Sequence, residues 1–141
     1  MNPINNLGHL EAQKAIEVIQ TELGKRGKAA IIAVVDAHGE LIALLRMDGA
    51  AFTSIQIAAN KAYTAARDRK PTHEIGQRVR DPQDGFDIAY YGDPKIVGWG
   101  GGLPVVVDGA VVGAIGVSGL HESEDIELAQ LGVDAILSSR T

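Results

Sequence analysis

The stretch that decides the fold, residues 98–119, reads GWGGGLPVVVDGAVVGAIGVSG. Apolar, β-branched segments lie on either side of Asp108-Gly109, and this dipeptide fits a two-residue turn whose residues need positive φ. The glycine run Gly100, Gly101 and Gly102 precedes the first segment, and it indicates close backbone approach, unusual dihedrals or a bound ligand. We therefore expect a β-hairpin at the centre of a sheet, with both strands buried on both faces.

Outward from this hairpin, the chain predicts a second hairpin and a set of helices. Residues 30–35 and 41–47 have the composition of strands, with a turn at 36–39, and 95–98 is a candidate for one more short strand. Apolar residues recur at helical spacing over 12–23, 54–68 and 123–137, and a short helix is expected between 71 and 80. Paired strands flanked by helices favour an α+β domain with an antiparallel sheet.

Length and composition restrict the number of domains and the classes of function that the chain can have. The 141 residues fit one domain, residues 1–141, and 45% hydrophobic with 22% charged residues is typical of a globular chain. The net charge of −5 argues against a general nucleic-acid or anionic-membrane surface. No cysteine is present, so disulfides, thiolate metal sites and cysteine nucleophiles are excluded. The first ten residues lack the pattern of a secretory signal and the apolar runs are too short to span a bilayer, so we expect a cytoplasmic protein.

Three polar residues stand out as candidate ligand contacts. His9 lies in the first turn of the first helix, where it is either a solvated residue or a ligand for iron. Arg46 ends a strand and either holds the carboxylate of a ligand or pairs with Asp48. Lys61 lies at the margin of the apolar stripe of its helix, and a lysine buried there could act as a base, an imine former or an anion anchor.

Common catalytic motifs are absent. Residues 98–103 lack the last glycine of the dinucleotide-binding motif G-x-G-x-x-G, and they lead into a strand and not into a helix. The sequence also contains no Gly-Lys-Ser/Thr phosphate loop. Ser118 does not sit in a nucleophile elbow. The four histidines share no ligand spacing, so a structural zinc site is not expected. Haem needs only one or two protein ligands and an apolar slot, and the sequence leaves it open.

Several ordered blocks together resemble a known family. They are VVDA with Gly39, then RMDGA at 46–50, KAYTA at 61–65, GGGLPV at 100–105, Asp108-Gly109, and GAIGVSG at 113–119. They are similar to the blocks of the GlcG/HbpS-like haem-binding family, a domain that also forms the carboxy-terminal part of PduO-type corrinoid adenosyltransferases. Two departures concern the haem ligands: relatives often carry a histidine where this chain has Leu45, and His121 is present near the expected pocket rim.

The resemblance implies a profilin-like α+β fold, with a five-stranded antiparallel sheet flanked by helices, assembled as dimers or larger rings up to octamers. It implies a small-ligand binding protein for haem or a related tetrapyrrole, with the pocket between subunits. Expected contributors are His9 as axial iron ligand, Arg46 and Lys61 as carboxylate partners, and the backbone of Gly100 to Gly102 as the wall.

Two other function classes stay open. The chain could be an enzyme acting on a small hydroxy- or oxo-acid, with Lys61 or His121 as general base and Arg46 as carboxylate anchor. Alternatively, it is a structural or assembly partner of a metabolic enzyme. His121 is otherwise an ordinary helix-entry residue.

Overall fold

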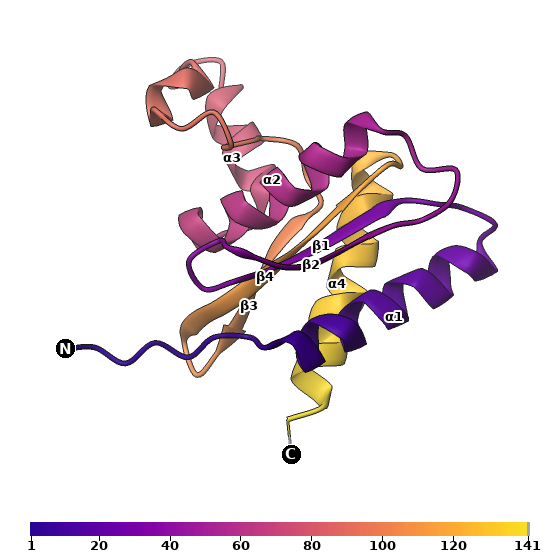
Figure 1. The fold of residues 1–141 in the computed structure, drawn as a ribbon. Coiled ribbons are helices and arrows are strands. Elements are labelled where there is room, and N and C mark those ends of the chain that lie inside the picture. The colour runs from indigo at the N-terminus through magenta and orange to yellow at the C-terminus, as the bar shows by residue number, and fades with distance from the viewer. Residues whose placement is uncertain (141) are drawn as a thin grey trace.

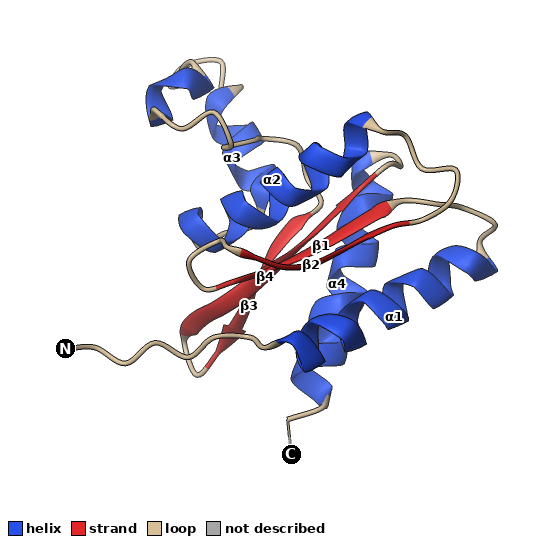
Figure 2. Ribbon diagram, in the orientation of Figure 1, coloured by secondary structure: helices blue, strands red, loops and turns tan. Residues whose placement is uncertain are grey.

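An antiparallel sheet of four strands, in the order β2-β1-β4-β3, separates two layers of helices (Figures 1 and 2). The computed structural model describes residues 1–140. In chain order the elements are α1 (His9–Lys25), β1 (Ile31–Asp36), β2 (Leu41–Arg46), α2 (Thr53–Asp68), α3 (Thr72–Val79), a 3-10 turn (Ile88–Tyr91), β3 (Gly102–Val107), β4 (Ala110–Ser118) and α4 (Glu122–Ser138). Helices α1 and α4 cover one face of the sheet, and α2 covers the other. The α+β class expected from the sequence is confirmed. Among the described helices, none has both the length and the apolarity that a membrane crossing requires.

The hairpin β3–β4, expected from residues 98–119, turns where the sequence predicts. Asp108 and Gly109 have φ of 51° and 79°, the pair of positive values that a type I′ turn requires. Strand β4 is central and buried from Val111 to Ser118, as expected. Strand β3 lies at the sheet edge instead, and Pro104, which has no N–H to donate, fits an edge strand. The expectation of a central position is therefore right for β4 and wrong for β3.

The expectation of five strands is wrong, because residues 95–98 do not pair with the sheet. The hydroxyl of Thr64, a buried residue of α2, donates to the carbonyl of Lys95 at 3.1 Å. The same oxygen accepts from the N–H of Val97 at 3.1 Å. One side chain thus satisfies backbone groups that a strand neighbour would otherwise bind, and the segment runs along α2.

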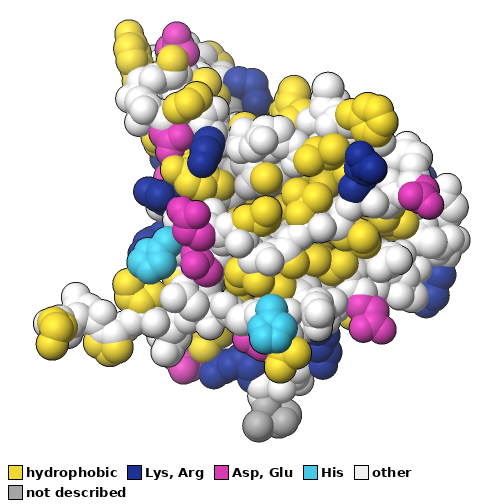
Figure 3. All heavy atoms as spheres, viewed as in Figure 1, with side chains coloured by type: hydrophobic (Ala, Val, Ile, Leu, Met, Phe, Trp, Pro, Cys, Tyr) yellow, Lys and Arg dark blue, Asp and Glu magenta, His cyan; other side chains and the backbone are white. Residues whose placement is uncertain are grey.

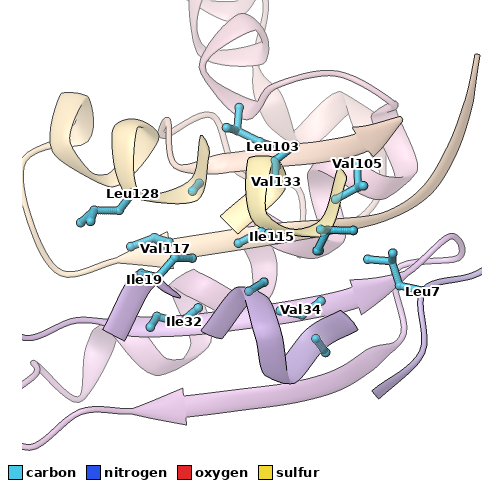
Figure 4. Packing of buried hydrophobic residues seen from close by; sticks show 14 of the residues in the cluster. Leu7, Ile19, Ile32, Val34, Leu103, Val105, Ile115, Val117, Leu128 and Val133 are labelled. Carbon is cyan, nitrogen blue, oxygen red and sulfur yellow. The ribbon is translucent and has the colours of Figure 1, made fainter. Parts of the chain in front are cut away.

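The sheet is packed differently on its two faces. Alternate β1 residues, such as Ile32 and Val34, join a large core with α1 and α4 (Figure 4). The other face meets α2 through small side chains: Ala58, Ala62, Ala65 and Ala66. A Cβ added to Gly116 of β4 would lie 2.2 Å from the Ala58 carbonyl oxygen, so this glycine allows the close approach. Helix α2 therefore lies almost directly on β4.

Ion pairs hold the first turn of α4 against α1. Arg26 binds Glu22 at 2.8 Å and Glu124 at 3.0 Å, and it also binds Glu127. Lys28 binds the other oxygen of Glu124 at 2.7 Å. Hydrogen bonds from Lys28 and then Arg26 hold the pKa of Glu124 below its ordinary value. This network fixes the start of α4, which carries the acidic residues of the site below.

A buried lysine–aspartate pair as candidate functional site

Lys61 of α2 and Asp125 of α4 meet at the end of β4. The Lys61 Nζ donates to Asp125 Oδ2 at 3.1 Å and to the backbone carbonyl of Val117 at 2.9 Å. Each of the two side chains is 3% exposed. A Cβ on Gly101 would lie 2.9 Å from Nζ, so the glycine leaves the space that the amine occupies. Elements distant in sequence thus converge on one amine.

A pocket of about 280 Å³ opens beside this pair. Its walls are Ser54, Lys61, Trp99, Gly100, Ser118, Gly119, Leu120, Glu122 and Asp125. The carboxylates are held by backbone donors: Glu122 accepts from the Gly100 N–H at 2.5 Å, and Asp125 Oδ1 accepts from the Leu120 N–H at 3.1 Å. Contacts within residues 1–140 use two of the three N–H donors of the Lys61 ammonium.

Burial dominates the electrostatics of the pair. Removal from water lowers the pKa of Lys61, and attraction to Asp125 opposes this only in part. Burial likewise raises the pKa of Asp125, with Lys61 opposing. Burial therefore brings the pKa values of the two groups closer together than they are in water. In its uncharged form the Lys61 amine can act as a base or a nucleophile.

Arg46 lies at the same end of the sheet as this pocket. It pairs with Ile31 across β2 and β1, and Ile31 pairs with Ser118 of β4, so these residues form one row. The guanidinium carbon is 5.6 Å from the centre of the exposed Phe52 ring. Within the described chain no carboxylate, that of Asp48 included, lies within 4.0 Å of Arg46. Its charge is thus available to a ligand.

His9 is far from Lys61 within one chain. It is exposed as the first residue of α1, on the opposite face of the sheet. The preceding segment is tied to the start of β4, since the Leu7 N–H donates to the Val112 carbonyl at 2.9 Å. Lys61 instead binds Val117, and five strand residues span about 17 Å. A single chain therefore does not bring His9 and Lys61 together.

His121 serves as the N-cap of α4. Its Nδ1 accepts from the Ser123 N–H at 3.2 Å, and the side chain is exposed. The pocket wall includes its neighbours Leu120 and Glu122 but not His121 itself. The structure shows His121 in the helix-entry role. Its alternative role as a general base for a small hydroxy- or oxo-acid stays a prediction.

The glycine run approaches the chain's own helix. A Cβ on Gly102 would lie 2.4 Å from the carbonyl oxygen of Lys61, and one on Gly101 would lie 2.6 Å from that of Val117. Gly100 lines the pocket, with Glu122 against the space of its absent side chain. As predicted, other atoms come close to the backbone of these glycines. At Gly101 and Gly102 those atoms belong to the same chain.

Sequence reasoning missed the acidic wall of the pocket. Asp125 lies in the acidic first turn of α4, yet it is at helical spacing with Ala129 and Val133 on the buried face. A carboxylate on a buried stripe is a signal that the sequence does carry. The roles of Ser54 and Ser118 had no such signal, because both depend on how α2 crosses β4.

A second groove, with several apolar side chains in its walls, lies between α2 and β2. Hydrophobic side chains gather over β2 and the adjoining side of α2 in Figure 3. The cavity there is about 320 Å³ and includes Leu41, Leu44 and Ile55 in its walls. Strand β2 is an outer strand of the sheet, and Leu41 is 55% exposed. The strand's free edge and its apolar surface end at Arg46.

Comparison with known proteins adds a family context. The model of the family described as haem degrading protein HbpS-like matches residues 7–134. Protein GlcG of Escherichia coli K12 is 39% identical over 112 residues, which cover 77% of this chain and 81% of GlcG.

Two solved structures share the fold. Klebsiella pneumoniae protein ORFY has a TM-score of 0.93 and 30% identity, covering 98% of this chain and 95% of its own. The PduOC:heme complex has a TM-score of 0.85 and 26% identity, covering 92% and 94%.

Proposed function

The chain belongs to the HbpS-like haem-degrading family, and from this premise we propose that it binds haem or a related tetrapyrrole as a homo-oligomer. The family predicted from the ordered sequence blocks is confirmed. The observation that carries the proposal is this membership across nearly the whole chain, together with a solved haem complex of a protein with the same fold. When bound, haem would supply an iron centre with axial positions for protein or external ligands.

His9 is the proposed iron ligand. Imidazole is a common axial ligand of haem iron, and an exposed ring can reach a cofactor that lies on the surface. As the first residue of α1, His9 is held by a helix anchored through Ala12, Ala15 and Ile19 in the core. This support would fix the position of the imidazole.

Arg46 is the proposed partner of a propionate. Arginine binds carboxylates through paired N–H donors, and no carboxylate of the described chain occupies Arg46. Lys61, the other cation expected in this role, is buried and already bound to Asp125. Phe52 lies beside Arg46 and is 77% exposed, so an aromatic ring is available to the macrocycle.

The proposed ligands require more than one copy of the chain. His9 lies near the Asp36–Gly113 end of the sheet, whereas Arg46 lies at the Ile31–Ser118 end. The two ends of β1 are about 17 Å apart, and α1 occupies the face opposite α2. A haem on the apolar surface of β2 and α2 would take its propionate contact from one subunit and its iron ligand from another.

Titration with hemin, followed by absorbance, tests the proposal. The wild type is expected to shift and sharpen the Soret band, and His9→Ala to weaken binding by about tenfold or more and change the spectrum. His38→Ala, which removes an exposed turn histidine, is the matched control and should bind as the wild type does. No Soret change with the folded wild type would overturn haem binding.

Separate variants test the propionate contact. Arg46→Ala should weaken hemin binding by about tenfold and leave the spectrum unchanged, since the iron ligands stay in place. Arg140→Ala removes an exposed arginine whose contact with Asp108 is 3.8 Å and should have no effect. Equal losses in the two variants, or a loss only with Arg140→Ala, would contradict the assignment of Arg46.

A further inference from the structure

The haem proposal leaves the Lys61 pocket without a role. The pocket contains an amine with one unused N–H, the carboxyl group of Asp125 at 3.1 Å, and the carboxylate of Glu122. Ser54 and Ser118 also line it, and neither hydroxyl hydrogen-bonds to another residue in the described part of the chain. Two free hydroxyls and an amine around one small space are suited to an oxygen-bearing ligand.

We propose that this pocket binds small neutral aldehydes and that Lys61 captures them covalently as an imine. The cavity of about 280 Å³ is smaller than the roughly 300–1,000 Å³ of pockets that take drug-sized ligands, so a ligand of a few heavy atoms fits. Trp99, which is 59% exposed, lies at the mouth and can cover an apolar tail.

The charges of the pocket select a neutral compound over an oxo-acid. Glu122 and Asp125 provide two carboxyl groups, while Lys61 is the only cation among the lining residues. A ligand carboxylate would lie near Glu122 with no free cation to neutralise it, because Arg46 is not part of the wall. A carbonyl oxygen, in contrast, needs only donors, and the hydroxyls of Ser54 and Ser118 supply them.

Lys61 and Asp125 together can carry out every proton transfer that imine formation requires. The Lys61 ammonium first transfers a proton to Asp125, and the amine lone pair then forms a bond to the carbonyl carbon. The carbonyl π electrons move to oxygen, which takes the proton from Asp125. The nitrogen next returns a proton to Asp125, which passes it to the hydroxyl group. Water leaves as the nitrogen lone pair forms the C=N bond, so the products are a protonated imine, the Asp125 carboxylate and one water.

Reductive trapping tests this site. The folded protein is incubated with acetaldehyde and sodium cyanoborohydride, and the alkylated lysines are located by peptide mass spectrometry. Lys61 is expected to be alkylated about tenfold faster than the exposed Lys14 and Lys25, and this preference should vanish in denaturant. Alkylation of Lys61 that is no faster than that of the exposed lysines would overturn the proposal.

Two comparisons separate the role of the pocket from general lysine reactivity. Asp125→Asn should slow alkylation of Lys61 about tenfold and leave Lys14 unchanged, with circular dichroism confirming the fold. Glyoxylate, an anionic aldehyde of similar size, should react more slowly than acetaldehyde at Lys61 but not at Lys14. Faster reaction of glyoxylate at Lys61 would contradict the assignment to neutral aldehydes.

Discussion

Lys61 Nζ lies 3.1 Å from Asp125 Oδ2, and both side chains are 3% exposed. The pair joins α2 to the first turn of α4 across the end of β4. Because neither group reaches bulk water, each depends on the other to remain buried. Stability and reactivity at this end of the molecule are therefore linked through one contact.

Removing one partner of this pair should destabilise the protein strongly. Lys61→Met or Asp125→Leu alone is expected to lower the free energy of unfolding by about 3–5 kcal/mol, because an uncompensated buried charge remains. The double variant should lose less than the sum of the two single variants. Urea denaturation measures these values, and single-variant losses below about 1 kcal/mol would contradict a buried, mutually dependent pair.

The tie between α1 and α4 should weaken in acid. The pKa of Glu124 lies below its ordinary 4.5 in the folded chain, first because of Lys28 and then because of Arg26. Between the folded-state pKa and the ordinary pKa of 4.5, the unfolded chain therefore binds more protons than the folded chain. The stabilisation by Glu124 is complete above pH 4.5 and is lost as the pH falls through the folded-state pKa.

The Glu124→Gln variant checks this pH effect. Its free energy of unfolding should fall less steeply than that of the wild type as the pH is lowered from 4.5. Parallel pH profiles for the two proteins would show that Glu124 does not carry the effect.

Gly116 and Gly24 form a contrasting pair for alanine substitution. At Gly116 a new Cβ would lie 2.2 Å from the Ala58 carbonyl, so Gly116→Ala should force α2 away from β4 and cost about 1–3 kcal/mol or more. At Gly24, within α1, nothing lies within 4 Å, and Gly24→Ala should stabilise by about 0.5–1 kcal/mol. Thermal melting distinguishes the two, and equal effects would contradict the close contact.

Thr64 should hold the loop after the 3-10 turn in place. Thr64→Val keeps the side-chain shape but removes the partner of Lys95 and Val97, at a cost of about 1–3 kcal/mol. Limited proteolysis should then cut within residues 92–98 faster than in the wild type. Thr21→Val, at an exposed position of α1, is the control and should leave the cleavage rate unchanged.

The fold was largely predictable because its signals are local. In both hairpins two apolar segments are separated by turn residues, and Asp108-Gly109 also predicted the geometry of its turn. The edge position of β3 could not be inferred from apolar composition alone, although Pro104 carried a hint of it. The prediction of a short strand at 95–98 was wrong because Thr64, which is distant in sequence, binds the backbone of this segment.

The candidate site was predictable only in part. The margin position of Lys61 on its helix correctly indicated an amine facing a cleft. Its partner Asp125 belongs to another helix, and the meeting of the two depends on how α2 and α4 pack around the end of β4. The separation of His9 from Arg46 and Lys61 also follows from sheet register and helix layering, which spacing along the chain does not encode.

The most direct test of haem binding by a homo-oligomer is size-exclusion chromatography of the hemin-loaded protein with light scattering and absorbance at the Soret band. We predict that the Soret absorbance elutes with a species whose mass is a multiple of the 14.8 kDa chain. Elution of the protein at the monomer mass, or of hemin apart from the protein, would contradict the proposal.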